Sequence, residues 1–567
     1  PWEPADTAEK AFSTEGIAPP PKTQVQHLLE LAEASAELWH TPDLEAYATV
    51  QINGHAEHWP LSSASFANWL RLAFYRSESR PPGAQALAEA VSLLDARAQF
   101  EGPEYLVFVR VAEQGDRLYL DLCDSEWRVV EIDSRGWHVL ERSPVRFRRA
   151  RGMLPLPVPQ AGASLESLVR PMLNVEDDTG WRLLVSWLLA ALRPRGPYPL
   201  LVLQGEQGSA KSTTARVLRE LVDPGSAIAR SSPREERDLM VAARNGWVLS
   251  YDNLSRVQDW LSDALCRLST GGAFATRQLY TDAEEVLFSA QRPIILNGIE
   301  ELAERDDLRD RALIVTLPPI PEERRRDEST FWKEFERARP AILAGLLDAV
   351  SGAVRALPQM ELSRRPRLAD FALWATAAEE GLGWQPGAFM QAYEENRAAA
   401  VEISVEGNPV AQAVVSLARE REFKGTATEL LQLLTRRVGE EQARRRDWPG
   451  TPRKLSGLLR RAGASLRASG VSVEYERESG GSRTRLISIS PVAQRTAPTV
   501  PTVPQLLKSR ADSTLPHREE WDDTDSSGLE PSYLRPAESP VSTGEWDGWD
   551  DRDDPVQASA EREHFEI

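Results

Sequence analysis

The sequence predicts an α/β protein built around a nucleotide-binding sheet, preceded along the chain by an α+β domain and followed by a winged-helix domain. Three observations support this prediction. Apolar strands alternate with helices between residues 165 and about 320. The first of these strands leads into a glycine-containing loop and then a helix. Near the C-terminus, three amphipathic helices precede a hairpin, which is the winged-helix arrangement.

Changes in periodicity and composition divide the chain into six segments. The N-terminal domain mixes helical runs such as "TQVQHLLELAEASAELW" with β-rich runs such as "YLVFVRVA", and it ends near the Pro-rich "MLPLPVPQAG". We expect a disordered extension at 1–22, an α+β domain at 23–164, a phosphate-loop domain at 165–325, a helical segment at 326–405, a winged-helix domain at 406–492 and a disordered acidic tail at 493–567.

Composition excludes several protein classes. The chain has 567 residues, 41% of them hydrophobic, and no apolar run near eighteen residues, so we expect no membrane span and several cores. Its 2 cysteines, Cys123 and Cys266, exclude a disulfide framework and a Cys-rich zinc site. The chain starts at Pro1 without Met or a signal pattern, as expected of a piece of a longer protein. The strong preference for arginine over lysine suggests a GC-rich genome. We therefore expect the cytoplasm of a bacterium or of a phage-infected bacterial cell.

Charge is distributed unevenly. The formal net charge of −19 argues against nucleic acid, but the tail holds 17 acidic against 7 basic residues, whereas residues 436–485 hold 13 basic against 6 acidic. The third predicted helix of this basic module carries Arg453, Lys454, Arg460 and Arg461, which suit contacts with DNA phosphates and grooves. The alternative is a solvated basic face used for packing or protein contacts.

The loop "LQGEQGSAKST" has the pattern of a phosphate-binding loop. The strand Leu200–Leu203 precedes it, and the helix from about Lys211 offers free backbone N–H groups to an anion. Lys211 would reach the β- and γ-phosphates of ATP and Ser212 would bind Mg²⁺. The alternative is a chance glycine-rich turn. The candidate ATP-binding residues are Gly205, Glu206, Gln207, Gly208, Ser209, Ala210, Lys211, Ser212 and Thr213.

Ala210 stands where the usual pattern has its last glycine. The added methyl group costs little if the backbone φ of Ala210 is negative, and it strains the loop if φ must be positive.

Polar residues end the following strands. Asp252 ends the apolar run Trp247–Tyr251 and can hold the Mg²⁺ shell, although an Asp at a strand end can equally cap a turn. Asn297 follows the run Pro293–Leu296, and Arg311 precedes a fourth strand.

This ordered set, over residues 195–320, resembles superfamily 3 helicases, the AAA+ branch found in viral, phage and plasmid primase-helicases. The resemblance implies a Walker A motif at Gly205, Gly208, Lys211 and Ser212, and a Walker B motif at Asp252 and Asn253. Asn297 is similar to the polar sensor that orients the attacking water. Arg311 resembles the arginine supplied to a neighbouring subunit, and the alternative for it is an ion pair with Asp307 or Asp310. Gly271, Gly272, Arg277 and Tyr280 look like the motif leading into a DNA-contacting hairpin, although Arg277 can be an ordinary surface arginine.

Asn253 departs from this family pattern. The family has a second acidic residue there that activates water. Asparagine can position water but is a poor base, so we expect hydrolysis to be slow or to use a carboxylate from elsewhere. We nevertheless expect an active ATPase, because phosphoryl transfer depends mainly on positioning and charge.

Asp121 and Asp124 could suggest a metal-binding carboxylate pair, but we expect them to be solvated at a strand edge. Asp121 and Asp124 lack the one-apart spacing of a metal-binding pair on a strand, and no histidines form a ligand-spaced cluster.

Three functions remain open. The first is an ATP-dependent DNA helicase or origin-melting motor of a phage or mobile element, which would use ATP and Mg²⁺. It would form a homo-oligomeric ring on single-stranded or forked DNA, and a primase or polymerase is a possible partner. The second is an ATP-dependent DNA-binding switch or loader that does not unwind DNA. The third is a P-loop kinase or a protein-directed NTPase, for which we identify no acceptor carboxylate.

Overall fold

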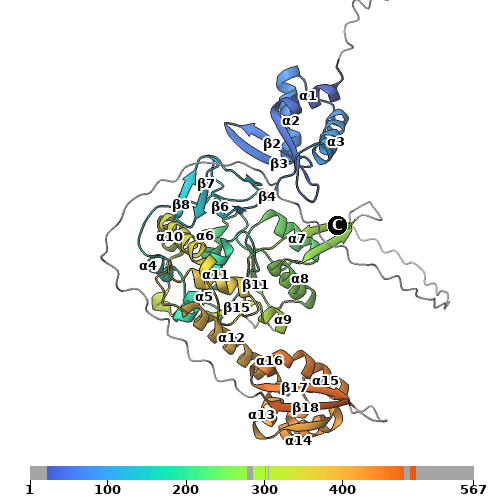
Figure 1. Ribbon diagram of the computed structural model, residues 1–567, viewed down its shortest axis with the longest axis vertical. Coiled ribbons are helices and arrows are strands. Elements are labelled where there is room, and N and C mark those ends of the chain that lie inside the picture. The colour runs from blue at the N-terminus through green and yellow to red at the C-terminus, as the bar shows by residue number, and fades with distance from the viewer. Residues whose placement is uncertain are drawn as a thin grey trace, which may run out of the picture. The chain divides into compact units, whose positions relative to one another are not determined.

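The computed structural model describes residues 22–277, 285–299, 302–303, 305–445, 447–477 and 485–492 (Figure 1). Only the backbone is described for 273–277, 285–289 and 477. The tail expected at 493–567, and all but the last residue of the extension expected at 1–22, lie outside these ranges.

The centre of the fold is a four-stranded parallel sheet in the order β11-β14-β10-β15. These strands include all four that the apolar runs predict. Strands β10, β14 and β15 consist mostly of buried apolar residues, as expected for parallel strands covered on both faces. Their bounds are β10 Leu200–Gln204, β11 Leu249–Leu254, β14 Ile294–Gly298 and β15 Ala312–Thr316.

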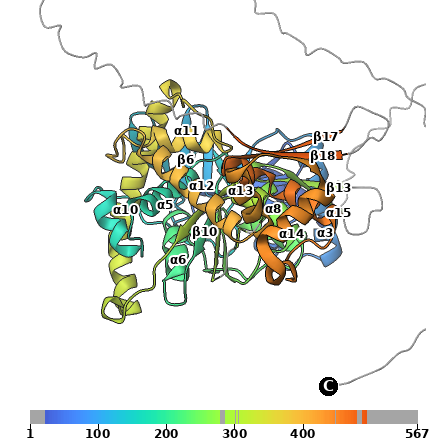
Figure 2. The same ribbon diagram turned by 90° about the horizontal axis from the view of Figure 1, so that it is seen from below.

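Helices cover both faces of this sheet. Leu201 and Leu203 of β10 share a core with helices α5 (Asp178–Ala191), α6 (Lys211–Val222) and α10 (Glu328–Ala356), which gather beside β10 in Figure 2. Leu200 and Val202, which point to the other face, share a second core with α7 (Glu236–Asn245) and α8 (Asp259–Thr270). Because side chains alternate along a strand, one apolar run supplies both cores.

The helical segment expected at 326–405 shares its core with the sheet. Its helices α10, α11 (Ala369–Ala377) and α12 (Ala388–Glu406) contribute Phe335, Phe371 and Phe389 to the same cluster as Leu201. The stretch Glu328–Gln359 is long and apolar enough to cross a membrane by composition alone, with a mean hydropathy of 1.4, and half of its most apolar window is buried in the protein.

Two separate cores divide the N-terminal segment predicted at 23–164. Helices α1, α2 and α3 pack on the antiparallel sheet β1-β2-β3 around Phe66, Leu70 and Phe74. The sheet β5-β6-β7-β8 instead places Val111, Leu120 and Val130 in the core beneath α10. The bounds are α1 Gln24–Ser35, β1 Ala36–His40, β2 Ala46–Ile52, β3 His55–Pro60, α2 Ala64–Glu78, α3 Ala84–Phe100, β4 Val107–Phe108, β5 Val111–Gln114, β6 Arg117–Asp121, β7 Val129–Asp133, β8 Gly136–Leu140, β9 Arg146–Phe147 and α4 Leu165–Val169.

The C-terminal module, residues 409–491, has its own core around Leu430, Leu455 and Ile487. The three predicted helices and the predicted hairpin are present, and two details differ. A third strand, β16, lies between the first two helices and pairs with β18. The third helix ends at Arg461 and a separate short helix follows. The bounds are α13 Pro409–Glu420, β16 Phe423–Thr426, α14 Ala427–Ala443, α15 Pro452–Arg461, α16 Gly463–Ala468, β17 Val471–Arg477 and β18 Arg485–Pro491.

A buried ion pair joins the N-terminal strands to the central sheet. Arg110 is fully buried, and its Nε donates to Asp223 Oδ1 at 2.9 Å. Asp223 Oδ2 accepts the backbone N–H groups of Trp247 and Val248, at 2.8 and 3.0 Å. The remaining guanidinium hydrogens reach the carbonyl groups of Asp121, Leu154 and Pro224. A buried charge is tolerated only with this degree of pairing.

Replacing Asp223 with Ala should therefore lower the free energy of unfolding by about 3–5 kcal/mol, because the substitution leaves Arg110 buried and unpaired. Two backbone N–H groups lose their acceptor in the same variant. Urea unfolding of the full chain, followed by tryptophan fluorescence, measures the change. Glu89→Ala, on the exposed face of α3, is the control and should change the free energy by less than about 0.5 kcal/mol. Equal stability of the two variants would contradict the role assigned to the pair.

Candidate functional site

The glycine loop, residues 205–210, connects β10 to α6 at the carboxyl ends of the parallel strands, the edge at which α/β sheets bind ligands. Gly205 and Gly208 both have positive φ, at 148° and 83°. A Cβ at Gly205 would lie 2.4 Å from the carbonyl oxygen of Leu317. Both positions therefore require glycine, as the loop pattern predicts.

Ala210 has a left-handed backbone, with φ 59° and ψ 30°. The strained alternative is therefore the correct one, because an L-residue pays about 1–2 kcal/mol in this region. Contacts hold the loop in place around it. Asn174, which no sequence motif indicates, donates to the carbonyl groups of Ser209 at 3.1 Å and Pro318 at 2.6 Å.

Lys211 folds over the glycine loop. Its Nζ donates to the carbonyl oxygens of Gly205 at 2.8 Å and Glu206 at 2.7 Å, and to Ser209 Oγ at 3.3 Å. Lys211 begins α6, so the first backbone N–H groups of this helix point at the same space. The loop therefore combines an ammonium group with a helix N-terminus, and both favour an anion.

Ser212 and Asp252 lie in direct contact. Ser212 Oγ donates to Asp252 Oδ1 at 2.9 Å, although the two residues come from α6 and β11. A hydroxyl and a carboxylate at this spacing are the oxygen donors that Mg²⁺ uses beside a nucleotide. Burial raises the pKa of the neighbouring Tyr251, which lies beneath this edge of the sheet.

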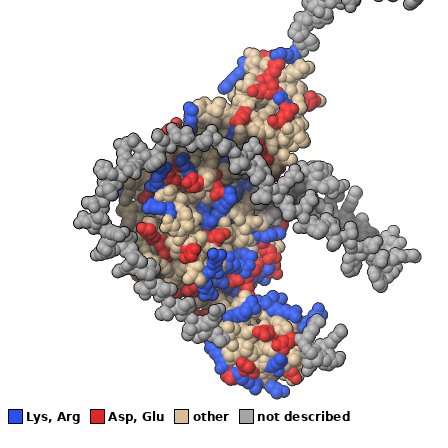
Figure 3. Space-filling view, in the orientation of Figure 1, with Lys and Arg blue, Asp and Glu red and all other residues tan. Residues whose placement is uncertain are grey.

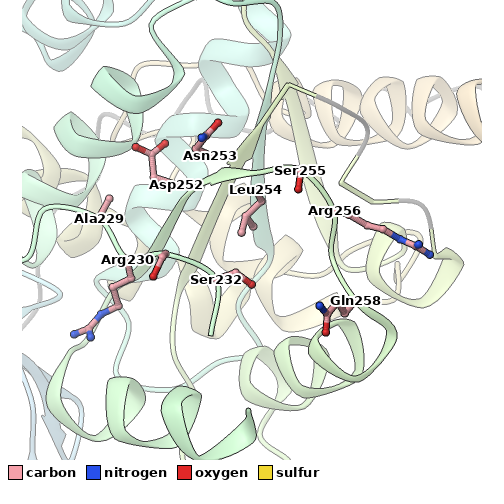
Figure 4. A pocket seen from close by; sticks show the side chains of 10 residues that line it. Ala229, Arg230, Ser232, Asp252, Asn253, Leu254, Ser255, Arg256 and Gln258 are labelled. Carbon is pink, nitrogen blue, oxygen red and sulfur yellow. The ribbon is translucent and has the colours of Figure 1, made fainter. Parts of the chain in front are cut away.

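A β-bulge turns the end of β11. The register with β14 shifts between Tyr251 and Leu254, and Asn253 has φ 55°. Figure 4 shows Asp252 and Asn253 side by side at this point, beside a cavity of about 700 Å³ from which the Arg230 side chain extends away. The backbone N–H of Asn253 donates to Asn297 Oδ1 at 2.7 Å.

Asn297 is 1% exposed. Its Nδ2 has no hydrogen-bond partner among the described residues. Asn297 lines a second cavity of about 190 Å³ together with Ser212, Asp252 and Glu328. An unpaired buried amide beside a cavity is costly unless it binds something there, so Nδ2 has a donor to offer a ligand.

Arg311 lies at the amino ends of the parallel strands, whereas the glycine loop lies at their carboxyl ends. Arg311 precedes β15, and its carbonyl oxygen accepts the backbone N–H of Leu200 at 2.9 Å. A five-residue strand of about 16 Å therefore separates Arg311 from the glycine loop of its own chain. Arg311 Nη1 donates to the carbonyl oxygen of Asp307, whereas the carboxylates of Asp307 and Asp310 bind other arginines.

The motif predicted to lead into a hairpin does so. Gly271, with φ 96°, ends α8, and β12 (Ala273–Arg277) pairs antiparallel with β13 (Glu285–Ser289). Arg277 is the last residue of β12 and is described by its backbone alone. Tyr280 lies outside the described residues.

The basic residues of α15 are exposed. Arg453, Lys454, Arg460 and Arg461 all face solvent, and Arg460 lies 5.0 Å from the ring of Tyr475 on β17. Thr451 caps the helix, which starts with Pro452. Figure 3 shows Lys and Arg gathered along the margins of this module. The four side chains thus stand on one short helix of an otherwise well-packed module.

The expectation that Asp121 is solvated at a strand edge is wrong, because Asp121 is buried and paired with arginine. Asp121 is 1% exposed and accepts Arg149 Nη2 at 2.7 Å, while Asp124 accepts Arg128 Nε at 2.7 Å. Within the described ranges, no group of three or more His, Cys, Asp or Glu residues could hold a metal ion. Arginine pairing, rather than a metal, accounts for both carboxylates.

Ala210→Gly should stabilise the protein by up to about 1 kcal/mol, because the relief of left-handed strain exceeds the entropy that glycine adds to the unfolded chain. Ala88→Gly, on the exposed face of α3, is the matched control and should destabilise by about 0.5–1 kcal/mol. Urea unfolding compares the two. The same sign for both variants would show that the backbone at position 210 is not strained.

Two family models match the chain. Residues 166–394 match the "Actinomycete integrative conjugative element replication protein" family, and residues 410–505 match the "AICE RepA C-terminal domain". The first range holds the sheet, the glycine loop, Asp252, Asn297 and Arg311. The second holds the C-terminal module.

Among solved structures, the C-terminal region of NrS-1 is 12% identical, with a TM-score of 0.38, covering 82% of this chain and 99% of that one. A second structure of this region is 11% identical, with a TM-score of 0.39 and coverage of 83% and 100%. A JCV helicase structure is 11% identical, with a TM-score of 0.20 and coverage of 40% and 66%. No curated protein matches the sequence. Through residues 166–394 and 410–505, the chain is similar to the replication proteins of actinomycete integrative conjugative elements.

Proposed function

We propose that this protein is an ATP-dependent motor that unwinds or melts DNA in the replication of an integrative conjugative element. The observation that carries the proposal is the contact between Ser212 Oγ and Asp252 Oδ1, 2.9 Å, at the carboxyl edge of a parallel sheet and beside a glycine loop. The family match of residues 166–394 supports the role in replication.

The geometry supports a proposed role for each residue around the loop. The N–H groups at the start of α6 and the Lys211 ammonium would bind the phosphates of ATP, with Lys211 exchanging its loop carbonyl acceptors for phosphate oxygens. Ser212 and Asp252 would hold Mg²⁺, which neutralises phosphate charge. The unpaired Asn297 Nδ2 would donate to a water or a phosphate oxygen.

The position of Arg311 supports action between subunits. Arg311 lies beside the start of β10, whereas the glycine loop follows the end of β10. It can therefore reach a phosphate only on a neighbouring chain. This is the geometry that an arginine finger supplied in trans requires, and a ring of identical subunits satisfies it.

Two elements would contact DNA. Helix α15 presents Arg453, Lys454, Arg460 and Arg461 to solvent, and the β12–β13 hairpin places Arg277 at the end of its first strand. Guanidinium and ammonium groups of this kind neutralise backbone phosphates, which provides affinity that depends on salt rather than on sequence.

An ATP-dependent DNA-binding switch or loader is the second candidate. Asn253 in place of a carboxylate favours it, because slow hydrolysis suits a switch better than a motor. The ATPase rate with and without single-stranded DNA, measured beside displacement of a strand from a forked duplex, separates the two. ATP-dependent displacement supports the motor. DNA binding that requires ATP, without any displacement, supports the switch.

Lys211→Ala should abolish ATP hydrolysis while the fold stays intact, because the loop keeps its glycines but loses the charge that contacts the phosphates. Lys333→Ala, an exposed lysine of α10, is the control and should keep the wild-type rate. Phosphate release measures activity, and circular dichroism checks the fold. Normal turnover in Lys211→Ala would place the site elsewhere.

Arg311→Ala should bind ATP normally but hydrolyse it about 10³-fold more slowly, which is the usual contribution of an arginine finger. Mixing it with Lys211→Ala should restore partial activity, because some interfaces then pair an intact glycine loop with an intact Arg311. The ATPase rate against mixing ratio, with DNA present, is the measurement. A flat line at the level of the two parents, with mixed oligomers confirmed by sizing, would exclude action in trans.

A further inference from the structure

The smaller of the two cavities beside Asp252 is lined by a further carboxylate that no sequence motif indicates. Glu328, the first residue of α10, lines this cavity of about 190 Å³ with Ser212, Asp252 and Asn297. It lies 76 positions beyond Asp252 along the chain. The end of β11, where the family resemblance implies a second acidic residue, carries Asn253 instead.

Contacts tie Glu328 to the helix that begins with Lys211. Glu328 Oε1 accepts Trp332 Nε1 at 3.3 Å, one turn further along α10. The Trp332 ring lies 3.8 Å from the guanidinium carbon of Arg216, which is one turn beyond Ser212 on α6. A cation–π contact of this kind attracts the two helices to each other. The contact therefore positions the start of α10 against the start of α6.

Two residues of complementary hydrogen-bonding character line this cavity. Asn297 Nδ2 is a buried donor without a partner among the described residues, and the Glu328 carboxylate is an acceptor. A water molecule between an amide donor and a carboxylate acceptor is oriented and can lose a proton to the carboxylate.

The neighbouring carboxylate, Asp327, is already in use. It caps α10 by accepting the backbone N–H of Thr330 at 2.9 Å and the hydroxyl groups of Ser329 and Thr330. These hydrogen bonds, with that of Ser329 the strongest influence, lower the pKa of Asp327, so it is a poor proton acceptor.

We propose that Glu328 is the general base of the ATP hydrolysis on which the proposed function rests, replacing the carboxylate that position 253 lacks. The water oxygen forms a bond to the γ-phosphorus as its proton passes to the Glu328 carboxylate. The bond from the γ-phosphorus to the β–γ bridging oxygen breaks, and its electron pair leaves with ADP. Glu328 then returns the proton to solvent.

Glu328→Gln keeps the size and the exposed position of the side chain but removes its basicity. We expect kcat for ATP hydrolysis to fall about 10²-fold or more, the usual contribution of a general base. The Kd for a non-hydrolysable ATP analogue should stay within a few fold of wild type. Glu334→Gln, on the same helix and paired with Arg326, is the matched control and should keep wild-type kcat and Kd.

The pH dependence of kcat distinguishes a base from a structural side chain. Any acid limb of the wild-type kcat profile that comes from this base should be lost in Glu328→Gln. Adding Asn253→Asp to Glu328→Gln should restore kcat at least tenfold, because Asp tolerates the positive φ of position 253 and returns a carboxylate to the end of β11.

The outcomes separate the two proposals. If the wild type and Glu334→Gln hydrolyse ATP and Glu328→Gln is equally fast, the assignment of Glu328 is wrong while the ATPase stands. A rise in Kd that accounts for the loss of activity would make Glu328 a binding residue and overturn its role as base. An acid limb that persists in Glu328→Gln, with no gain in the double variant, would overturn it as well. A wild type that neither binds nor hydrolyses ATP would overturn the proposed function itself.

Discussion

The carboxylate of Asp223 holds the two sides of the candidate site in register. It follows α6, the helix that begins with Lys211 and Ser212, and it binds the backbone N–H groups of Trp247 and Val248, which lead into β11 and so to Asp252. Arg110 neutralises its charge from the neighbouring sheet. Because buried charges must keep all their partners, these three segments cannot shift independently. The 2.9 Å contact between Ser212 and Asp252 joins two of these segments, α6 and β11.

Strain accompanies this rigidity. Ala210 and Asn253 both have left-handed backbones, and they lie at the ends of the two segments that Asp223 connects. The left-handed backbone costs Ala210 about 1–2 kcal/mol, whereas asparagine adopts this conformation more readily. Asn174 holds the loop around Ala210, and Asn297 holds the backbone of Asn253. Ala210 and Asn253 thus turn the glycine loop and the end of β11 toward the same cavity.

The two ends of the parallel strands differ. The glycine loop, Ser212, Asp252 and Asn297 lie at the carboxyl ends. Arg311 lies at the amino ends beside Asp310, which forms ion pairs with two arginines. A parallel sheet makes this separation unavoidable, because every strand ends at the same edge. An arginine that precedes its strand therefore faces away from the loop that follows the neighbouring strand. Under the proposed function, cooperation between Arg311 and the glycine loop would therefore use a second copy of the chain.

Local pattern was enough to predict the strands, the glycine loop and the three C-terminal helices, because period, turn residues and caps act over a few positions. The hairpin after Gly271 was expected from the family resemblance instead. The meeting of Asp252 with Ser212 was also predictable, since strand ends converge in a parallel sheet.

Four features were decided only by the tertiary structure. They are the sign of φ at Ala210, the sharing of the β5–β8 strands with the central core, the Arg110–Asp223 pair and the arrival of Glu328 beside Asp252. In the sequence, "RDEST" indicates only a capped helix start. The position of Glu328 at the site depends on how α10 packs on α6 through Trp332 and Arg216. No local pattern encodes a contact between residues more than a hundred positions apart.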